Sequence, residues 1–463
     1  MVNPKYLTTM NAKEAAAGTS QAEKAVHETV INACGNSFYL GENAVYDARP
    51  EVSGLGNSNV AIVGGTGCGK TVTVTGNLVH VNGVSMIVTV AKRRLVNVLC
   101  KEKSNEGYKI IFYDTTDPEC SYGYDPLDNA HSAADVDELA EQMTNRGRRQ
   151  EEVAYADKYW PEAAKAAMKS FIHLEIENAS YAERRPCFAN VVSMVRDLEI
   201  MSGGKETNFD AVFEASRRRN PESLASVFWK SLSLGAEKTL SCIVSTLKTS
   251  VENCVTEEIL ELCRKDVRID LGALGREKTM LIVNSSPFSP SSHTFINIMY
   301  GMALHELFSE AEKNENGRLD VPVHLVFDDF ACGCRINRFE EYISLLREAG
   351  ISVTLLLQSE TQLESMYGRG AASTIINNCD TYLYMGGMDV NTCRSVADRL
   401  NKPLHYVLNL PLEQVVIFRR GSKPVETRRY QTYSDPVYIR MAESYENRQK
   451  KTEADEENQE EKA

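Results

Sequence analysis

The sequence predicts an α/β protein in which a largely parallel, doubly wound sheet is interrupted by an inserted all-helical domain. Three observations lead to this prediction. Continuous runs of β-branched and aliphatic residues recur along the chain with helical patterns between them, which is typical of strands covered on both faces. The strand pattern then disappears between Leu127 and Val267, where only helical periodicity remains. Finally, a chain of 463 residues is too long for one ordinary core and favours two or three domains.

The apolar runs give the expected strands of the sheet. They are residues 60–63, 86–90, 110–113, 280–283, 323–327, 352–357, 381–385 and 415–418. Helices are expected between them at residues 72–79, 294–310, 339–348 and 393–399. Apolar strands that alternate with helices in this way predict parallel strands joined by helical crossovers.

The middle of the chain contains only helical patterns. The expected helices of this insertion are residues 133–146, 155–178, 189–201, 209–218, 221–234 and 237–254. Ser132 and Thr207 stand where helix N-caps are expected. The predicted organisation is a polar segment over 1–42, a nucleotide-binding domain in two halves over 43–127 and 268–440, the insertion over 128–267, and an acidic, disordered tail over 441–463.

The composition is that of an ordinary globular protein, with 43% hydrophobic and 25% charged residues. No stretch approaches roughly 18 uninterrupted apolar residues, so no transmembrane helix is expected. The 12 cysteines are dispersed and form no zinc-ligand spacing, which indicates a reducing cytosol. We therefore expect a cytoplasmic protein that docks at the cytoplasmic face of the cell membrane through partners. The net charge of −13 argues against a surface coated with nucleic-acid contacts, but it leaves a basic channel inside a ring open.

One motif predicts the chemistry. The run after the strand at 60–63 fits the phosphate-loop pattern G-x-x-x-x-G-K-[ST], and a helix follows it. Its residues, the expected nucleotide ligands, are Gly64, Gly65, Thr66, Gly67, Cys68, Gly69, Lys70 and Thr71. Backbone N–H groups of such a loop surround phosphates, Lys70 would reach the β- and γ-phosphates, and the Thr71 hydroxyl would hold Mg²⁺. The expected cofactors are ATP and Mg²⁺.

Besides the Thr71 hydroxyl, a carboxylate is needed to hold the metal, and it is expected at the end of an apolar strand. Asp328 and Asp329 follow the strand at 323–327, so Asp328 is the predicted Mg²⁺ partner. Asp329 stands where many such ATPases have a glutamate that polarises the attacking water. Gln358 follows the next strand and either senses the γ-phosphate or is an ordinary polar residue at a strand end. Arg347 is either an arginine finger for a neighbouring subunit or a surface residue.

Several blocks of the sequence resemble the type IV secretion coupling proteins, the conjugative DNA-transfer ATPases. Phe327-Asp328-Asp329-Phe330-Ala331 resembles the family's Asp-Glu-Phe-Ala strand end, and Leu357-Gln358-Ser359 with Gln362-Leu363 resembles its next strand end. Tyr122–Leu127 is similar to the Asn-Pro-Leu segment before the family's helical insertion. Tyr159-Trp160 and Ala236–Thr239 are similar to motifs within that insertion. The resemblance covers roughly residues 43–437. It implies a RecA-like P-loop NTPase sheet with an inserted all-alpha domain.

Three features depart from the family. Asp329 replaces a glutamate, and its shorter side chain suggests slow hydrolysis. Residues 90–94 (Val-Ala-Lys-Arg-Arg) replace the family's Asp-Pro-Lys-Gly-Glu, so that only Lys92 matches. Family members usually have N-terminal transmembrane helices, and none is expected in this sequence. The chain is therefore interpreted either as a cytoplasmic form docked onto separate membrane subunits or as a trimmed protein.

The resemblance also implies a function and partners. It implies a homohexameric ring that couples ATP hydrolysis to the movement of single-stranded DNA or a DNA–relaxase complex, with relaxosome proteins, secretion-channel ATPases and membrane subunits as partners. Basic clusters that could contact DNA are Lys92-Arg93-Arg94, Arg146 with Arg148-Arg149, Arg217-Arg218-Arg219, Arg419-Arg420 and Arg428-Arg429. Each cluster is equally consistent with a solvated face. Two other functions stay open: a DNA translocase of the chromosome-pumping or packaging type, and a non-motor adaptor that binds ATP and recruits proteins.

Overall fold

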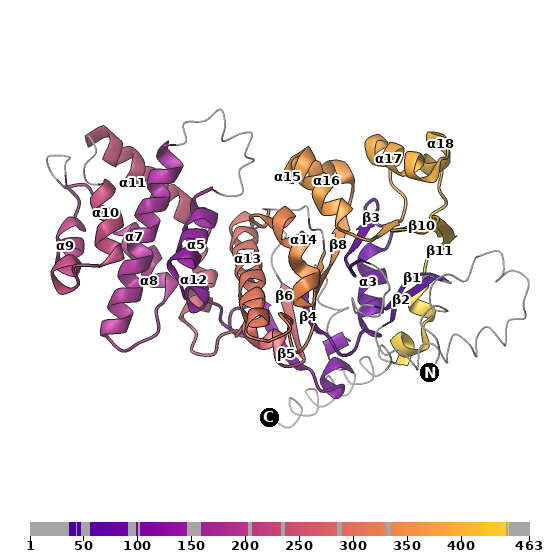
Figure 1. Cartoon of the computed structure of the whole chain (residues 1–463), viewed down its shortest axis with the longest axis horizontal. Coiled ribbons are helices and arrows are strands. Elements are labelled where there is room, and N and C mark those ends of the chain that lie inside the picture. The colour runs from indigo at the N-terminus through magenta and orange to yellow at the C-terminus, as the bar shows by residue number, and fades with distance from the viewer. Residues whose placement is uncertain are drawn as a thin grey trace, which may run out of the picture.

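The computed structural model describes residues 37–42, 44–47, 56–90, 99–100, 102–145, 159–201, 206–232, 237–284, 289–328, 330, 335–440 and 443. A large sheet with helices on both faces occupies one half of the molecule. A bundle of helices forms the other half, at the left of Figure 1. None of the helices in these ranges is both long enough and apolar enough to span a bilayer.

The main sheet has nine strands in the order β11-β10-β9-β3-β8-β7-β4-β6-β5. The strands are β3 (Val60–Val63), β4 (Ser85–Val90), β5 (Lys109–Asp114), β6 (Thr279–Asn284), β7 (Val323–Phe327), β8 (Ile351–Leu357), β9 (Thr381–Tyr384), β10 (Gln414–Arg419) and β11 (Val425–Arg428). Strands β3 to β9 pair in parallel, whereas β10 and β11 are antiparallel at one edge. Every strand expected from an apolar run is present, which confirms the predicted α/β sheet.

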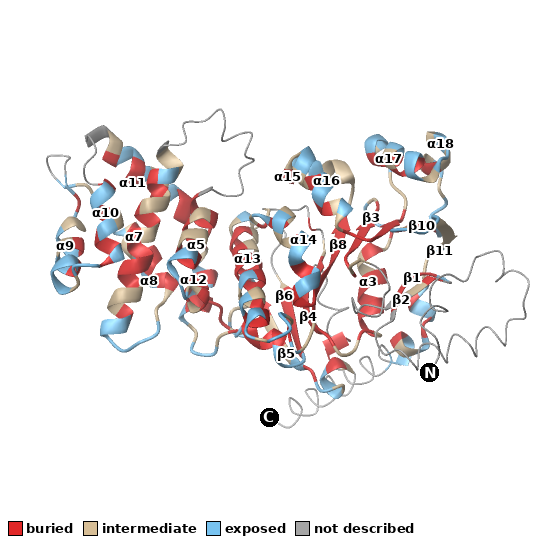
Figure 2. Cartoon of the chain, in the orientation of Figure 1, coloured by how far each residue is buried: buried red, intermediate tan, exposed pale blue. Residues whose placement is uncertain are grey.

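Alternate residues of each strand face opposite layers, as the period of a strand requires. Val63 and Leu357 belong to the core on one face, which includes α13 (Pro290–Glu312) and α14 (Phe339–Ala349). Ile62 and Leu356 belong to the core on the other face, which includes α3 (Lys70–Leu78). Helices α15 (Glu360–Tyr367), α16 (Arg369–Asn377), α17 (Val390–Leu400) and α18 (Leu404–Leu408) follow β8 and β9 in the chain. Figure 2 shows the strands as the buried centre of this half.

The insertion lies between β5 and β6. It comprises η2 (Pro126–Asn129), α5 (Ala133–Asn145), α7 (Tyr159–Tyr181), α8 (Phe188–Arg196), α9 (Asp210–Arg219), α10 (Leu224–Leu232), α11 (Glu237–Glu252), α12 (Glu257–Arg264) and η3 (Gly272–Gly275). Helix α7 packs against α5, α8, α10 and α11, so it is the centre of the bundle. Helix α12 was not expected from the sequence.

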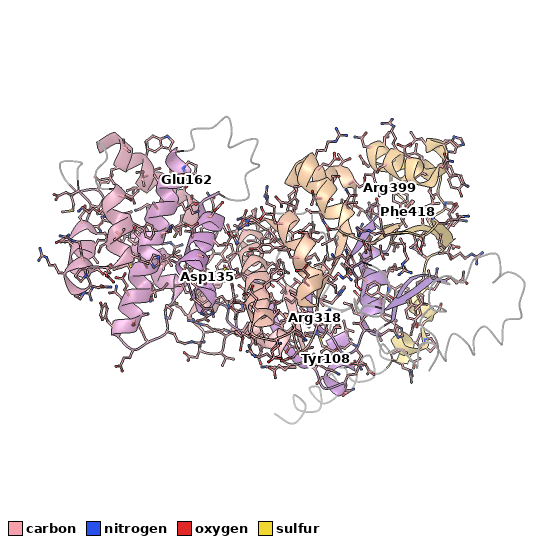
Figure 3. All side chains as sticks on the ribbon, viewed as in Figure 1. Tyr108, Asp135, Glu162, Arg318, Arg399 and Phe418 are labelled. Atoms are coloured by element: carbon pink, nitrogen blue, oxygen red, sulfur yellow. The ribbon has the colours of Figure 1, made fainter. Side chains whose placement is uncertain are left out.

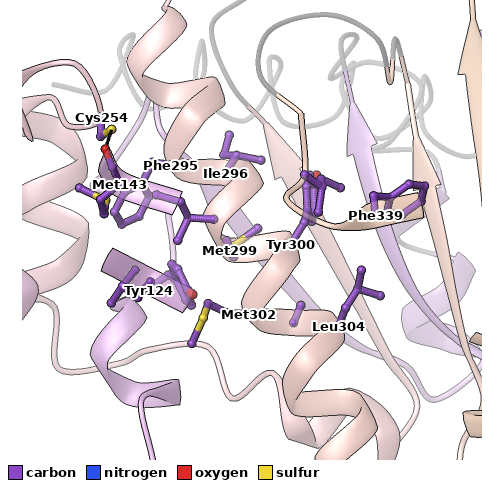
Figure 4. Close-up of a cluster of buried hydrophobic side chains, with 14 of the residues drawn as sticks. Tyr124, Met143, Cys254, Phe295, Ile296, Met299, Tyr300, Met302, Leu304 and Phe339 are labelled. Carbon is purple, nitrogen blue, oxygen red and sulfur yellow. Dashed lines mark hydrogen bonds between the residues drawn. The ribbon is translucent and has the colours of Figure 1, made fainter. Parts of the chain in front are cut away.

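A buried cluster joins the insertion to the sheet. Helix α13 contributes Phe295 and Met299, and these pack with Tyr124 of the segment after β5 and with Met143 of α5 (Figure 4). The Tyr124 and Phe295 rings meet edge to face at 6.0 Å. The insertion therefore shares one continuous core with the sheet.

The start of the sheet domain lies earlier than the sequence predicts. Strands β1 (Ser37–Gly41) and β2 (Ala44–Asp47) form a hairpin, and Phe38 and Leu40 are buried in the core beside α3. The Asn77 side chain of α3 donates to the Tyr39 carbonyl at 2.7 Å. The end of the expected polar segment 1–42 is thus a core strand, because its apolar side chains cover this face of the sheet. Most of the expected acidic tail lies outside the described residues.

Candidate functional site

The carboxyl edge of the sheet brings together three parts of the predicted site: the phosphate loop, Gln358 and Asp328. Strand β8 lies between β3 and β7, and all three are parallel. Val63 pairs with Leu357, and Phe327 pairs with Leu355. The loop at Gly64–Thr71, Gln358 and Asp328 therefore leave three neighbouring strands at the same edge, as expected for ligand sites in parallel sheets.

The loop between β3 and α3 is held by its neighbours on the sheet. The Gly64 N–H donates to the Leu357 carbonyl at 3.0 Å, and the Gly65 N–H donates to the Gly386 carbonyl at 2.8 Å. Gly67 and Gly69 have φ angles of 79° and 91°, in the left-handed region that favours glycine. These contacts fix the loop before any ligand binds.

Lys70 is buried and folds back over the loop. Its Nζ donates to the Gly64 carbonyl at 2.5 Å and to the Gly65 carbonyl at 3.1 Å. Its side chain is therefore aimed across the curve of the loop, where phosphate oxygens would replace the two carbonyls. The helix that starts at Lys70 directs its N-terminal end to the same place.

Thr71 and Asp328 connect the two halves of the site. The Thr71 hydroxyl lies 3.1 Å from Oδ1 and 3.0 Å from Oδ2 of Asp328. The described residues contain no group of three or more His, Cys, Asp or Glu side chains that could hold a metal ion alone. One hydroxyl and one carboxylate suit Mg²⁺, because this ion usually takes few protein ligands and completes its shell with water and phosphate oxygens.

Two other predicted residues differ in how they relate to this site, and a third is not described. Gln358 follows β8 and lies between the phosphate loop and Asp328 in strand order. Arg347 is exposed in the last turn of α14, and this turn lies beside the start of β7 and β8, because the Gly350 N–H donates to the Arg347 carbonyl and the Val323 N–H donates to the Gly350 carbonyl, both at 3.2 Å. Figure 3 labels Arg318 near this amino edge and Arg399 at the opposite end. Asp329 lies outside the described residues.

The helix behind the loop is also held at its far end. Lys103 is fully buried, and its Nζ donates to the carbonyls of Val79 and Val81 at 3.1 and 2.6 Å. Burial lowers the pKa of Lys103, while its 2.7 Å ion pair with Glu106 opposes that shift. A cation at this end of α3 complements the helix dipole.

One basic residue near the loop was not predicted as part of the site. Arg429 Nη1 donates to the Cys68 carbonyl at 2.9 Å. The sequence contains no indication of this contact, because the partners are 361 positions apart. From the sequence, Arg429 belongs instead to a possible DNA-binding cluster.

The other described basic clusters are occupied by partners within the chain. Arg217 and Arg218 both pair with Glu214, at 3.0 and 3.4 Å. Arg420 pairs with Asp380 at 2.8 Å, and Arg419 is buried. These contacts favour the interpretation of solvated or internally paired arginines. The clusters at 92–94 and 146–149 lie outside the described residues.

A carboxylate marks the junction between the site domain and the insertion. Asp125 accepts backbone N–H bonds from Leu127 at 2.9 Å and from Phe188 at 2.7 Å, and Arg268 lies 3.9 Å away. Burial raises the pKa of Asp125 to about 7, although these three groups oppose the shift. A second link joins α5 to the segment before α14, where Asn337 Nδ2 donates to Glu138 Oε1 at 3.0 Å.

A phosphate loop between a strand and a helix, facing an aspartate at the end of a parallel strand, defines a P-loop NTPase. The family model described as "Type IV secretory system Conjugative DNA transfer" matches residues 8–400. Because this match covers most of the chain, the protein belongs to that family.

Solved structures support the same fold. The bacterial conjugative coupling protein TrwBdeltaN70, in its unbound form, is 14% identical with a TM-score of 0.62, over 85% of this chain and 88% of that one. The plasmid coupling protein TrwB in complex with ADP and Mg²⁺ is 15% identical with a TM-score of 0.60, over 82% and 87%. VirB4 of Thermoanaerobacter pseudethanolicus is 12% identical with a TM-score of 0.53, over 88% and 98%. These likenesses confirm the RecA-like fold. No curated protein matches the chain significantly.

Proposed function

We propose that this protein is an ATP-driven coupling protein that recruits a single-stranded DNA–relaxase substrate and moves it toward a type IV secretion channel. The observation that supports ATP use most directly is the contact between Thr71 and Asp328 beside a complete phosphate loop. Coupling proteins with this fold have been solved with ADP and Mg²⁺ and with an ATP analogue. Membership of the conjugative DNA-transfer family supports the substrate class.

Each residue at the carboxyl edge has a proposed role. The N–H groups of the loop and Lys70 bind the β- and γ-phosphates, and Lys70 exchanges its bonds to Gly64 and Gly65 for phosphate oxygens. Thr71 and Asp328 hold Mg²⁺, which neutralises charge that develops on the phosphates. Gln358 orients water or senses the γ-phosphate from the strand between them. Asp329 polarises the attacking water.

Arg347 can act only on the site of a neighbouring subunit. It lies at the amino edge of the sheet, whereas the phosphate loop lies at the carboxyl edge of the same chain. Strand β8, with 7 residues, separates these edges by about 23 Å at the rise of a strand. An arginine finger from Arg347 therefore requires a neighbouring subunit, which the proposed homohexameric ring supplies. We propose further that this ring docks at the cytoplasmic face of the membrane on secretion-channel ATPases and membrane subunits.

The test is ATP hydrolysis by purified, oligomeric protein with and without single-stranded DNA. We expect turnover that rises on adding DNA and disappears in Lys70→Ala, while Lys109→Ala, an exposed lysine at the other end of the sheet, keeps the wild-type rate. Absence of hydrolysis with DNA present would reject the motor. ATP binding without turnover would instead favour the second candidate, a non-motor adaptor, which the shorter Asp329 side chain keeps open.

Two further experiments, one with a variant and one with double-stranded DNA, separate the candidates. Asp329→Glu should keep or raise the rate if Asp329 polarises water, and its abolition of turnover would assign Asp329 another role. A stimulation by double-stranded DNA that exceeds the single-stranded effect would favour a translocase of the chromosome-pumping or packaging type.

A further inference from the structure

Arg429 reaches the phosphate loop from the last strand of the sheet. Its N–H donates to the Glu413 carbonyl at 2.8 Å, which fixes its backbone directly after β11. Its Nη1 donates to the Cys68 carbonyl at 2.9 Å. The same nitrogen lies 3.2 Å from the position that a Cβ atom on Gly69 would take. The guanidinium therefore lies against the outer side of residues 68 and 69.

This contact orients one peptide unit of the loop. The Cys68 carbonyl and the Gly69 N–H belong to the same trans peptide unit and point in opposite directions. Because Arg429 holds the carbonyl outward, the Gly69 N–H is directed to the inner side, toward which the neighbouring Lys70 side chain also folds. A free loop would spend part of its time with this peptide turned the other way, since glycine at a φ of 91° has wide freedom.

We propose that Arg429 is a positioning residue that presets the phosphate cradle and adds positive charge beside it. This inference rests on the proposed function, since it assigns Arg429 to the same nucleotide site. The bond from a guanidinium to a backbone carbonyl is charge-assisted and stronger than a neutral one. Fixed N–H donors need no rearrangement when the phosphates arrive, so ligand binding loses less conformational entropy.

The segment after Arg429 fixes it to the helix that carries the loop. The Tyr430 ring stacks on Tyr39 with centroids 4.6 Å apart. Thr432 packs on α3 at Gly76, where a Cβ atom would come within 2.1 Å of Thr432 Cγ2. Asp435 lies 2.7 Å from His80 Nε2 just beyond the end of α3. Arg429, α3 and the loop therefore form one unit.

Hydrogen bonds from two side chains hold the Asp435 carboxylate at the end of this segment. Burial alone would raise the pKa of Asp435, but hydrogen bonds from His80 and Tyr430 lower it below its usual range. The carboxylate consequently stays ionised near neutral pH and keeps the segment on α3. This attachment explains how an arginine so distant in sequence can hold one carbonyl of the loop.

The test compares Arg429→Ala, Arg429→Gln and Arg429→Lys with wild type by calorimetric titration of ADP and of inorganic pyrophosphate. Arg428→Ala is the matched control, because Arg428 is the adjacent, exposed arginine. We expect Arg429→Ala and Arg429→Gln to weaken both ligands by about tenfold to a hundredfold, as for loss of a bond to a charged group. Arg429→Lys should restore part of the affinity, and Arg428→Ala should bind both ligands as wild type does.

The outcomes separate this inference from the proposed function. If either neutral variant remains folded and binds ADP and pyrophosphate as wild type does, Arg429 only anchors the last strand and the inference is wrong. A lower melting temperature with unchanged pyrophosphate affinity leads to the same conclusion. If wild type itself binds neither ligand, the proposed nucleotide site fails and the inference fails with it.

Discussion

The sheet and the helical insertion use the same polar residue types in opposite ways. In the sheet, Thr71 and Asp328 end at one open edge, because parallel strands bring their carboxyl ends together. In the insertion, the half-buried Glu177 and the buried Glu175 of α7 are paired within the bundle. Glu177 accepts from Ser216 at 2.6 Å and from Ser223 at 2.8 Å, and Glu175 pairs with Arg184 at 2.6 Å. These insertion carboxylates are paired within the bundle, whereas Asp328 lies at the open edge where we propose that a ligand binds.

This comparison predicts that substitutions at the edge change chemistry and that substitutions in the insertion change stability. The largest effect is expected for Asp328→Asn, which removes a charge facing the proposed metal. Hydrolysis should fall by about a hundredfold or more, with little change in melting temperature.

Steady-state ATPase assays with a magnesium titration measure this effect. Asp320→Asn is the control, since that exposed carboxylate precedes the same strand at the opposite edge. A wild-type rate of ATP hydrolysis in Asp328→Asn would contradict the comparison, because the carboxyl edge of the sheet would then be ordinary protein surface.

Glu177→Ala should give the largest loss of stability in the insertion. It leaves the hydroxyls of Ser216 and Ser223 without their carboxylate, so the free energy of unfolding should fall by about 2–3 kcal/mol. Denaturant unfolding measures the loss, ATP affinity should stay unchanged, and the exposed Glu222→Ala serves as control. A tenfold weaker ATP affinity in a folded variant would show that the two regions are not independent in this way.

Asp125, at the junction between the sheet domain and the insertion, provides a further test of this comparison. Its folded pKa of about 7 lies above the usual aspartate value, so it contributes stability at low pH that is lost as pH rises through about 7. The amide of the Asp125→Asn variant does not titrate. The stability of wild type relative to Asp125→Asn should therefore decrease by about 2 kcal/mol between pH 5 and pH 8.

Free energies of unfolding at several pH values give this difference. The titratable groups around Asp125 are the same in both proteins, namely Arg268, Asp128, Cys187, Cys263, Tyr113 and Tyr124. A difference that is constant with pH would show that Asp125 stays ionised, held by Arg268 and its two N–H donors.

The smallest effect is expected for Arg218→Gln on the exposed side of α9. Because Arg218 pairs with Glu214, single-stranded DNA affinity should change by less than about twofold, with the same salt dependence. A fall of about one in the slope of log affinity against log salt would instead identify a phosphate contact. Fluorescence anisotropy at several salt concentrations distinguishes these results.

The sequence predicted the inner strands and most of the site for a physical reason. Strands covered on both faces must be apolar throughout, as in β8, and the residue that follows such a strand is placed by topology. Asp328 and Gln358 could be located in this way, and Thr71 from the phosphate-loop motif between β3 and α3. The RecA-like fold and the coupling-protein family are confirmed, while the roles of the individual residues stay predictions.

The features that the sequence did not predict depend on contacts between distant segments. Strand β11 is an edge strand, Val-Glu-Thr-Arg, with no run of apolar residues to mark it. Hairpin β1–β2 is short and stands next to polar sequence, although it covers α3. In the sequence, Arg429 looks like a solvent-exposed arginine, and only folding of the chain brings it to Cys68.

The most direct test of the central claim is calorimetric titration of ATP into wild type and Lys70→Ala, with and without Mg²⁺. The arrangement of Thr71 and Asp328 predicts one site per chain, tighter binding with Mg²⁺ than without it, and loss of binding in Lys70→Ala. Equal binding by the two proteins, or affinity that does not respond to Mg²⁺, would contradict a phosphate and metal site at the carboxyl edge of this sheet.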